Sequence, residues 1–174
     1  MDGASHILKR LEPDETFFGV LDLSSGYHQV SIHEDSRDYF TIILPNGKFR
    51  YTVLPQGCSI SSDFFNLITD PEIRGSPGIF KNVDDILTSA TSLKQLEERM
   101  RKLLQICRKK NMKLSPKKLQ LGKEVVYGGG ILEGAKAQGD QSEGVYISPT
   151  KDKLEAFLNI TTPTCKKEVQ RLGL

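Results

Sequence analysis

The sequence has 174 residues, of which 37% are hydrophobic and 26% are charged, a size and composition typical of one globular domain. No apolar run approaches the roughly 20 residues of a membrane-spanning helix, and the first residues lack the apolar stretch of a signal peptide, so neither a membrane protein nor a secreted one is expected. Three cysteines without a CxxC pair argue against a disulfide framework and a zinc knuckle, and predict a reducing, intracellular setting.

The net charge of +2 hides two halves of opposite sign. Residues 1–92 contain 7 Lys and Arg against 13 Asp and Glu, whereas residues 93–174 contain 17 against 9. Ten of the basic residues fall between Arg99 and Lys123, where no acidic residue occurs. Such a stripe is typical of a surface that contacts a polyanion, but also of a solvated helix face followed by a basic loop, and charge alone does not separate the two.

Strand and helix signals alternate in the first half of the chain. The apolar run at 17–23 has the length of a strand and ends in small turn residues, which places Asp22 at a strand end. The β-rich runs at 39–44 and 48–54 flank Asn46-Gly47, a dipeptide that favours a type I′ hairpin. Residues 59–63 offer N-cap side chains to a helix that we expect to end before Pro71.

The second half continues the alternation. Two short strands, at 79–82 and 86–88, flank a turn that contains Asp84 and Asp85. Ser92 and Gln95 form a capping box, and the apolar spacing after it predicts a helix of about five turns. The chain continues with a strand at 124–132 that three glycines interrupt, and with a polar insertion at 135–144. It then contains a strand at 145–147 and a helix at about 150–158. Together these elements predict one α+β domain.

Three carboxylates carry the predicted chemistry. If the strands that present Asp22, Asp84 and Asp85 are neighbours in one antiparallel sheet, the three acids converge. Carboxylates around one point bind two divalent cations, Mg²⁺ or Mn²⁺, which activate an attacking hydroxyl and stabilise a pyrophosphate leaving group. An Asp-Asp pair in a turn is by itself more often solvated, so the prediction depends on its conjunction with Asp22.

Six motifs, in this order and at this spacing, resemble the reverse transcriptase of gypsy-type LTR retrotransposons. They are VLDLSSGYHQV at 20–30, LPQG at 54–57, VDDIL at 83–87, LSPKK at 114–118, VYGG at 126–129 and KEVQRLGL at 167–174. The resemblance implies a polymerase palm-like antiparallel sheet packed on helices, with partial fingers and no complete thumb or connection. Residues 1–174 are then a single reverse-transcriptase domain fragment, in which 1–92 form the palm and fingers part with the carboxylates, 93–132 the basic helix and primer-holding segment, and 133–174 the insertion and the start of the connection.

The resemblance also implies roles at the nucleotide. Tyr27 occupies the position whose ring lies beneath the incoming sugar, where a rigid aromatic plate excludes a 2′-hydroxyl. Gln56 would hydrogen-bond the incoming nucleotide, and Gly57 would permit the tight turn that follows it. From the residues alone, a half-buried packing tyrosine and an ordinary Pro-x-Gly turn are the simpler interpretations.

Four further residues are implied to contact the primer or other nucleic acid. Gly128 and Gly129 sit where the family holds the primer end, although they also fit a β-bulge. Lys117 and Lys118 lie in the segment whose lysine contacts phosphate or donates a proton to pyrophosphate, and a simple phosphate contact is favoured in so basic a run.

The implied reaction is RNA-directed DNA polymerisation, in which a primer 3′-hydroxyl attacks a deoxynucleoside triphosphate. Asp22, Asp84 and Asp85 would be the catalytic carboxylates and would hold two Mg²⁺ ions, with Mn²⁺ as a substitute. The implied partners are a primed RNA or DNA template, deoxynucleoside triphosphates and adjoining ribonuclease H and integrase domains, with no membrane. The implied location is cytoplasmic or inside a retroelement particle.

Two departures from the family favour an alternative. Asn82 stands two residues before the Asp pair, where the family usually has tyrosine. The family's fingers segment, whose basic residues grip the triphosphate, would also lie before the start of this chain. The alternative is a non-catalytic, degenerate or domesticated fragment that keeps the fold and binds nucleic acid, and a DNA-templated polymerase of a related virus is a third interpretation.

Overall fold

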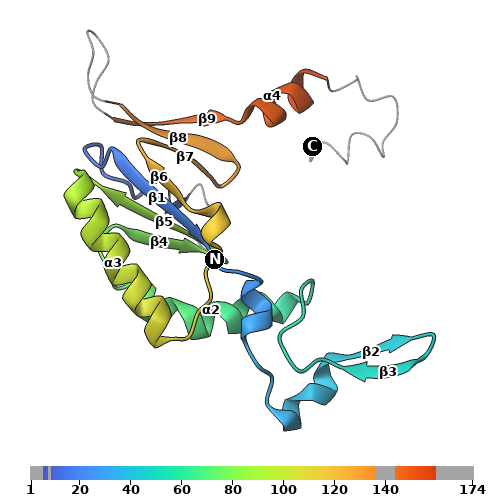
Figure 1. Ribbon diagram of the computed structural model, residues 1–174. Helices are drawn as coiled ribbons and strands as arrows, with labels where there is room; N and C mark the ends of the chain where they lie inside the picture. The colour runs from blue at the N-terminus through green and yellow to red at the C-terminus, as the bar shows by residue number, and fades with distance from the viewer. Residues whose placement is uncertain (1–5, 8, 136–143, 160–174) are drawn as a thin grey trace.

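A four-stranded antiparallel sheet forms the centre of the computed structural model, which describes residues 6, 7, 9–135 and 144–159. Its strands run in the order β4-β5-β1-β6 (Figure 1). Their bounds are Ile79–Asn82 for β4, Asp85–Ala90 for β5, Phe17–Asp22 for β1 and Gln120–Gly122 for β6. This architecture confirms the predicted palm-like α+β fold.

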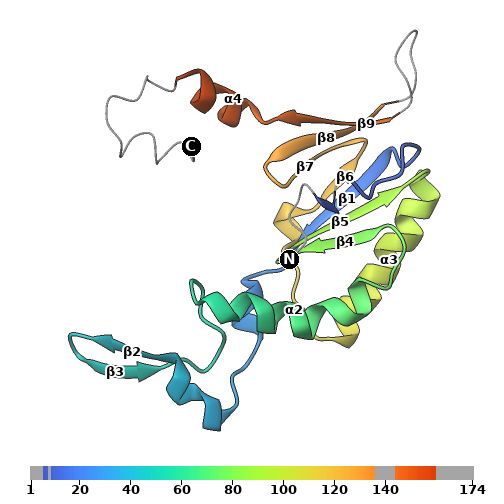
Figure 2. The same cartoon turned by 180° about the vertical axis from the view of Figure 1, so that it is seen from behind.

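Both faces of the sheet are covered, which explains why β1 is an almost continuous apolar run. Leu21 and Ile86 contribute to a core with helices α2 (Ser59–Ile73) and α3 (Leu93–Lys109). Phe18, Val20 and Leu87, on the alternate positions, join a second core with the sheet β7-β8-β9. Figure 2 shows the helices and this second sheet on opposite sides of the central strands.

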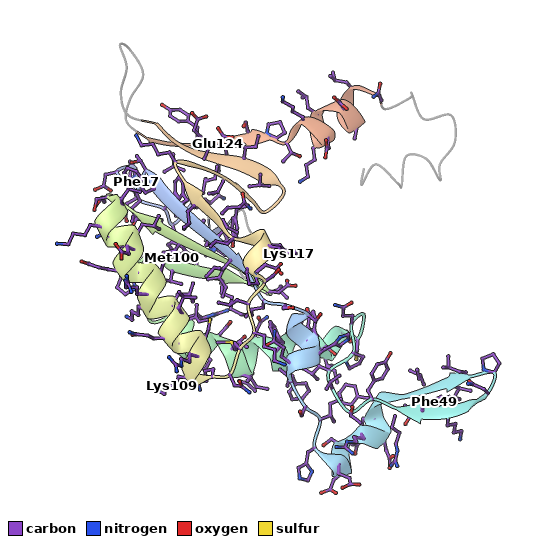
Figure 3. The ribbon with its side chains drawn as sticks, viewed as in Figure 1. Phe17, Phe49, Met100, Lys109, Lys117 and Glu124 are labelled. Carbon is purple, nitrogen blue, oxygen red and sulfur yellow. The ribbon has the colours of Figure 1, made fainter. Side chains whose placement is uncertain are left out.

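Helix α3 begins at its predicted cap and covers the sheet with its predicted apolar stripe. The Ser92 side chain accepts a hydrogen bond from Gln95 N at 3.3 Å, as an N-cap residue does. The Gln95 side-chain oxygen accepts a hydrogen bond from Thr91 N at 2.8 Å. Met100, labelled in Figure 3, and Leu103 are among its buried residues, and basic residues end the helix at Lys109.

Helix α2 is longer than predicted. It starts after Cys58, which provides no side-chain cap, and it runs through Pro71 to Ile73. Proline removes one intrahelical donor, yet Arg74 N still donates to Asp70 O at 2.9 Å beyond it. Ile73 is fully buried, so packing of the last turn against the sheet outweighs the local preference to stop.

The hairpin β2 (Thr41–Leu44) and β3 (Gly47–Arg50) is confirmed, but its predicted type I′ turn is wrong. Leu44 pairs with Gly47, so the turn residues are Pro45 and Asn46. The proline ring holds φ near −65°, which is incompatible with the positive φ that a type I′ turn requires. Every residue of the two strands is exposed, and the hairpin, with Phe49 labelled in Figure 3, projects away from the central sheet.

The expected interrupted strand at 124–132 is instead a hairpin. Strands β7 (Glu124–Tyr127) and β8 (Gly130–Ala135) pair through Tyr127 and Gly130, with Gly128 and Gly129 as the two-residue turn. The φ angles of these glycines are 60° and 76°, as in a type I′ turn. Positive φ at both positions is the reason this turn uses glycine rather than forming a bulge.

The last described elements agree with their predictions. Strand β9 (Gly144–Pro149) pairs with β8, and helix α4 (Lys151–Leu158) follows it. Most of the predicted insertion, Cys165 and the motif at 167–174 lie outside the described residues. Among the described helices, none has the length and apolar character needed to cross a membrane.

Candidate active site

The register of β1 and β5 brings two of the predicted carboxylates face to face. Asp22, the last residue of β1, pairs with Asp85, the first residue of β5. Asp84 precedes Asp85 in the turn from β4, and its carbonyl oxygen accepts a hydrogen bond from Leu23 N at 2.9 Å. The predicted adjacency of the two strands is therefore correct, and it arises from antiparallel pairing between segments far apart in the chain.

Burial and the charges around Asp85 shift its pKa. Burial raises the pKa of Asp85, and the negative charges of Asp84 and Asp22 raise it further. Lys118 opposes this effect and lowers the pKa of Asp85. Its ammonium Nζ donates to Asp22 Oδ1 at 2.9 Å, and this hydrogen bond raises the pKa of Lys118. The site thus concentrates negative charge that one lysine partly neutralises.

The donor set fits a hard divalent cation in its chemistry, because it consists of carboxylates whose mutual repulsion a cation would relieve. However, no three His, Cys, Asp or Glu side chains converge in metal-ligand geometry within the described ranges. In this structure, the ammonium of Lys118 is the positive charge that pairs with Asp22. Ligation of two ions by Asp22, Asp84 and Asp85 stays a prediction.

A cavity of about 510 Å³ opens beside the carboxylates. Asp22 and Asp85 form part of its wall, and all four predicted primer-contacting residues also line it: Lys117, Lys118, Gly128 and Gly129. The two lysines come from the 3₁₀ helix η3 (Pro116–Lys118), which Figure 3 shows at the end of the sheet through the label of Lys117. Two lysine side chains and a glycine turn therefore line the same cavity as Asp22 and Asp85.

Backbone pairing beyond β1 holds η3 in this place. Ser24 N donates to Lys113 O at 2.9 Å, and Ser115 N donates to Asp22 O at 2.8 Å. Leu23 and Leu114 form an isolated antiparallel bridge between these two hydrogen bonds. This ladder fixes where η3 begins and brings Lys118 to Asp22.

Gln29 reinforces the ladder, and sequence reasoning missed its role. Its side-chain nitrogen donates to Ser24 O and Lys113 O at 2.6 and 2.9 Å, and its side-chain oxygen accepts from Lys113 N at 2.6 Å. We call these three bonds the Gln29 clamp. Gln29 belongs to the quoted motif at 20–30, but nothing in that motif indicates a partner as distant as Lys113.

Tyr27 lies on the 3₁₀ helix η1 (Gly26–Gln29), which packs next to the turn of the acids. A Cβ atom on Gly26 would lie 2.9 Å from Phe65 Cζ and 3.3 Å from Asp84 Cβ, so glycine allows this close approach. The ring of Tyr27 packs on Phe65 with centroids 5.1 Å apart, and its hydroxyl shares a hydrogen bond of 2.8 Å with Ser62 Oγ. Tyr27 is half-buried and does not line the 510 Å³ cavity.

The other two predicted nucleotide residues lie elsewhere. Gln56 and Gly57 form an exposed turn before α2, where Gly57 has a φ of 81°. Neither residue lines the cavity beside the acids. The structure therefore places the four predicted primer-contacting residues beside the carboxylates, whereas the Gln56-Gly57 turn lies outside that cavity.

Lys81, one residue before Asn82, is a second feature that sequence reasoning missed. Its side chain is only 1% exposed and its ammonium donates to Asn66 Oδ1 at 2.8 Å and to Asp70 Oδ1 at 2.9 Å. The ammonium also lies 4.8 Å from the ring centroid of Phe65. Burial lowers the pKa of Lys81, although Asp70 opposes this shift. Lys81 thus links the strand before the acids to α2.

The chain matches one family model and several retroelement polyproteins. The family model "Reverse transcriptase (RNA-dependent DNA polymerase)" matches residues 3–171. The retrovirus-related Pol polyprotein from transposon 412 of Drosophila melanogaster is 34% identical over 59% of this chain, and the Gag-Pol polyprotein of Koala retrovirus is 28% identical over 95%. The chain spans 8% and 10% of these two relatives.

Solved structures agree with the sequence relatives. A foamy viral protease-reverse transcriptase in complex with double-stranded DNA superposes with a TM-score of 0.81 at 25% identity, covering 97% of this chain and 28% of that one. A foamy viral protease-reverse transcriptase in complex with an RNA/DNA hybrid gives a TM-score of 0.78 at 25% identity, covering 95% and 21%. The arrangement of carboxylates, lysines and glycines therefore lies on a known scaffold, and the chain belongs to the reverse transcriptase (RNA-dependent DNA polymerase) family.

Proposed function

We propose that this chain is the catalytic palm part of an RNA-directed DNA polymerase of the gypsy retrotransposon type. The observation that carries the proposal is the pairing of Asp22 with Asp85 beside Asp84, at a cavity that Lys117, Lys118 and the Gly128-Gly129 turn also line. Membership of the reverse transcriptase family supports the same reaction class.

In the proposed reaction, the primer 3′ end lies against the Gly128-Gly129 turn, where backbone without side chains lets a phosphate approach closely. Lys117 and Lys118 attract the phosphates of the primer strand. Asp22, Asp84 and Asp85 would hold two Mg²⁺ ions, or Mn²⁺, which supply activation of the 3′-hydroxyl and neutralise charge on the leaving pyrophosphate. Lys118 must release Asp22 for that carboxylate to ligate an ion, and its flexible, largely exposed side chain permits the movement.

Tyr27 is proposed to select deoxynucleotides. Its ring is held by Phe65 and Ser62, so it forms a rigid plate next to the turn of the acids. A plate in that position leaves no room for a 2′-hydroxyl. Gln56 and Gly57 are proposed to contact the nucleotide from the turn before α2, which requires the substrate to bridge the distance between that turn and the carboxylates.

The longer relatives and the solved structures support proposals about nucleic-acid partners and adjoining domains. Two solved neighbours are complexes with double-stranded DNA and with an RNA/DNA hybrid, which supports a primed RNA or DNA template as the partner. The relatives are polyproteins, which supports adjoining ribonuclease H and integrase domains. The division at residues 92 and 132 and the location in cytoplasm or particle remain predictions.

Primer extension on an RNA template tests the function. The chain, supplied with Mg²⁺ and then Mn²⁺, is expected to extend the primer with deoxynucleotides, and Asp84→Asn is expected to abolish extension while circular dichroism stays unchanged. Robust extension by Asp84→Asn would overturn the assignment of the carboxylates.

Asn82 favours a second candidate, a domesticated fragment that binds nucleic acid without polymerising it. Asn82 pairs with Asp85 and stands where the family usually has tyrosine. This candidate predicts that the parent chain binds a primer-template duplex tightly, that Asp84→Asn binds it equally well, and that neither extends it with either metal.

A further inference from the structure

A buried cation lies over the ring that supports Tyr27. The side chain of Lys81 is 1% exposed, and its ammonium lies 4.8 Å from the ring centroid of Phe65. Phe65 is itself 1% exposed, and its ring packs on that of Tyr27 with centroids 5.1 Å apart and planes 43° apart. Side chains from β4, α2 and η1 are therefore in contact in series, and the last of them is the proposed sugar-selecting plate.

Stability alone does not explain a charged side chain at this depth. Burial of an ammonium is costly, and a buried ion pair is often no more stabilising than apolar side chains of the same volume. Ile79, two residues before Lys81 and on the same face of β4, is apolar and packs in the same core as Phe65. This face of the strand therefore accepts apolar residues, and the lysine provides something that they lack.

The lysine provides directional contacts around Phe65. Its ammonium donates to Asn66 Oδ1 at 2.8 Å and to Asp70 Oδ1 at 2.9 Å, and both acceptors lie on the helix that carries Phe65. These bonds hold the ammonium in one place. A cation held over an aromatic ring attracts the face of that ring, so it favours one ring orientation.

The orientation of Phe65 matters because η1 packs closely on it. A Cβ atom on Gly26 would lie 2.9 Å from Phe65 Cζ, so the ring has little space to turn on this side. The hydroxyl of Tyr27 is bonded to Ser62 Oγ, which also lies on α2. Tyr27 is thus positioned by α2 and by the ring of Phe65, and both are tied to β4 through Lys81.

We propose that Lys81 sets the plane of the Tyr27 ring through Phe65, and thereby the preference for deoxynucleotides over ribonucleotides. Lys81 is a positioning residue in this role, because it contacts Phe65 and not the nucleotide. A Tyr27 ring that is free to tilt would make room for a 2′-hydroxyl. The inference rests on the proposed function, since it assumes that Tyr27 faces the sugar of the incoming nucleotide.

Lys81→Met tests the proposal, because it removes the cation and keeps a long unbranched side chain. The ratio of kcat/KM for a deoxynucleotide to that for the matching ribonucleotide measures sugar selection, and a mere loss of folded protein does not change this ratio. Aromatic ¹³C NMR of labelled tyrosine reports the position of the Tyr27 ring without turnover, because the ring current of Phe65 acts on its signal. Tyr27→Phe assigns that signal.

Two variants separate positioning from stability. Arg74→Met removes another cation paired with Asp70, at 2.7 Å, but the Arg74 side chain is 60% exposed, and Lys81 stays over the ring of Phe65 in this variant. The double variant Lys81→Met/Asp70→Leu removes the buried cation together with its acidic partner. It therefore lacks the contact with Phe65 without leaving a carboxylate that has lost its buried partner.

Lys81→Met is expected to lower the sugar ratio by about two- to fivefold, the size of one cation–π contact, and to shift the Tyr27 signal. The double variant should show both changes, and Arg74→Met should show neither. Lys81→Arg, which keeps a cation at the ring, should restore most of the parent ratio. In a Phe65→Leu background, Lys81→Met should lower the ratio no further, because the ring that transmits its effect is absent.

Three results would overturn the proposal. A parent ratio in Lys81→Met would show that the cation does not act on sugar selection. Equal losses of both activities would indicate general damage. A lowered ratio that returned to the parent value in the double variant would make lost stability the cause.

Primer extension by the parent chain separates this inference from the proposed function. A parent that extends primers while Lys81→Met keeps its sugar ratio retains the proposed function and excludes the role of Lys81. A parent that does not extend primers overturns the proposed function together with the sugar-selection step. The Tyr27 signal of Lys81→Met then decides whether Lys81 positions the ring at all.

Discussion

Nζ of Lys118 lies 2.9 Å from Oδ1 of Asp22, so a cation of the protein itself occupies one of the proposed metal-binding carboxylates. The side chain of Asp22 is 11% exposed and that of Lys118 is 64% exposed. The pair thus consists of a largely buried carboxylate and an exposed, flexible ammonium. Movement of the Lys118 side chain away from Asp22 would increase the net negative charge of the site.

Lys118→Met is expected to raise the pKa of Asp85 further, because the positive charge of Lys118 lowers that pKa. The same change should increase Mg²⁺ affinity by about two- to fivefold, since a competing cation is removed. Carboxyl-carbon NMR titration and Mg²⁺ titration measure the two effects. Lys117→Met is the matched control, and an equal pKa change in both variants would contradict a specific Lys118–Asp22 interaction.

Asp85→Asn is expected to stabilise the fold at pH 7. The pKa of Asp85 is raised above its ordinary value of 3.8, so the folded state holds its proton more tightly than the unfolded chain does. Stability therefore falls as the pH rises from that value through the raised pKa, and the penalty is fully present above it. Thermal unfolding should show a midpoint about 1–3 °C higher at pH 7 and no gain at pH 3.

Asp14→Asn, at an exposed position, is the control for Asp85→Asn. It should leave the midpoint unchanged at both pH values. A stabilisation by Asp85→Asn that persisted at pH 3 would show that relief of charge is not its cause.

Lys81→Met is expected to lower the free energy of unfolding by about 2–4 kcal/mol, because it leaves Asp70, whose side chain is 13% exposed, with Arg74 as its one remaining ionic partner among the described residues. The double variant Lys81→Met/Asp70→Leu should recover much of that loss. Urea unfolding of the single and double variants yields the coupling between the two residues.

The exposed pair of Arg50 and Asp38 provides the comparison for the Lys81 pair. Both pairs have an N···O distance of 2.9 Å, but the side chains of Arg50 and Asp38 are 58% and 78% exposed. Arg50→Met should therefore cost less than about 1 kcal/mol. Equal losses at both sites would mean that burial does not control the strength of these ion pairs.

Gln29→Leu is expected to reduce the preference for deoxynucleotides over ribonucleotides by about two- to tenfold. The change removes the three bonds of the Gln29 clamp, so the 3₁₀ helix that carries Tyr27 loses its attachment to Lys113. The ratio of kcat/KM for the two sugars measures the effect. Gln105→Leu, at an exposed position of α3, should keep the ratio of the parent, and equal losses of both activities in Gln29→Leu would indicate general damage instead.

The sequence predicted those elements whose bounds depend on neighbouring residues, such as a capping side chain or an apolar repeat. Helix α3 has both a capping side chain, Ser92, and an apolar stripe of constant period, so its predicted start and its length of about five turns were correct. The Asn46-Gly47 prediction failed because Pro45 restricts the same turn, and the Pro71 prediction failed because packing of Ile73 extends the helix. The helix-ending signal was outweighed by contacts that are distant in sequence.

The same distinction applies to the site. The predicted convergence of Asp22 with the Asp84-Asp85 turn required their strands to be neighbours in one sheet, and the register of β1 and β5 meets that condition. The motifs also identified Lys118 and the two glycines that line the cavity. Burial of Lys81 and its place over the ring of Phe65 depend on how α2 packs on the central sheet, so no local pattern reveals them.

The central position of β1 has a consequence for biosynthesis. Both strands that flank it, β5 and β6, are made after it, because Phe17 pairs with Ala90 and Phe18 pairs with Gly122. As the chain leaves the ribosome, β1 therefore has two open hydrogen-bonding edges until β5 has been added, and one until Gly122 has been added. The pairing of Asp22 with Asp85 precedes completion of the sheet, and a nascent chain interrupted between residues 23 and 84 contains neither.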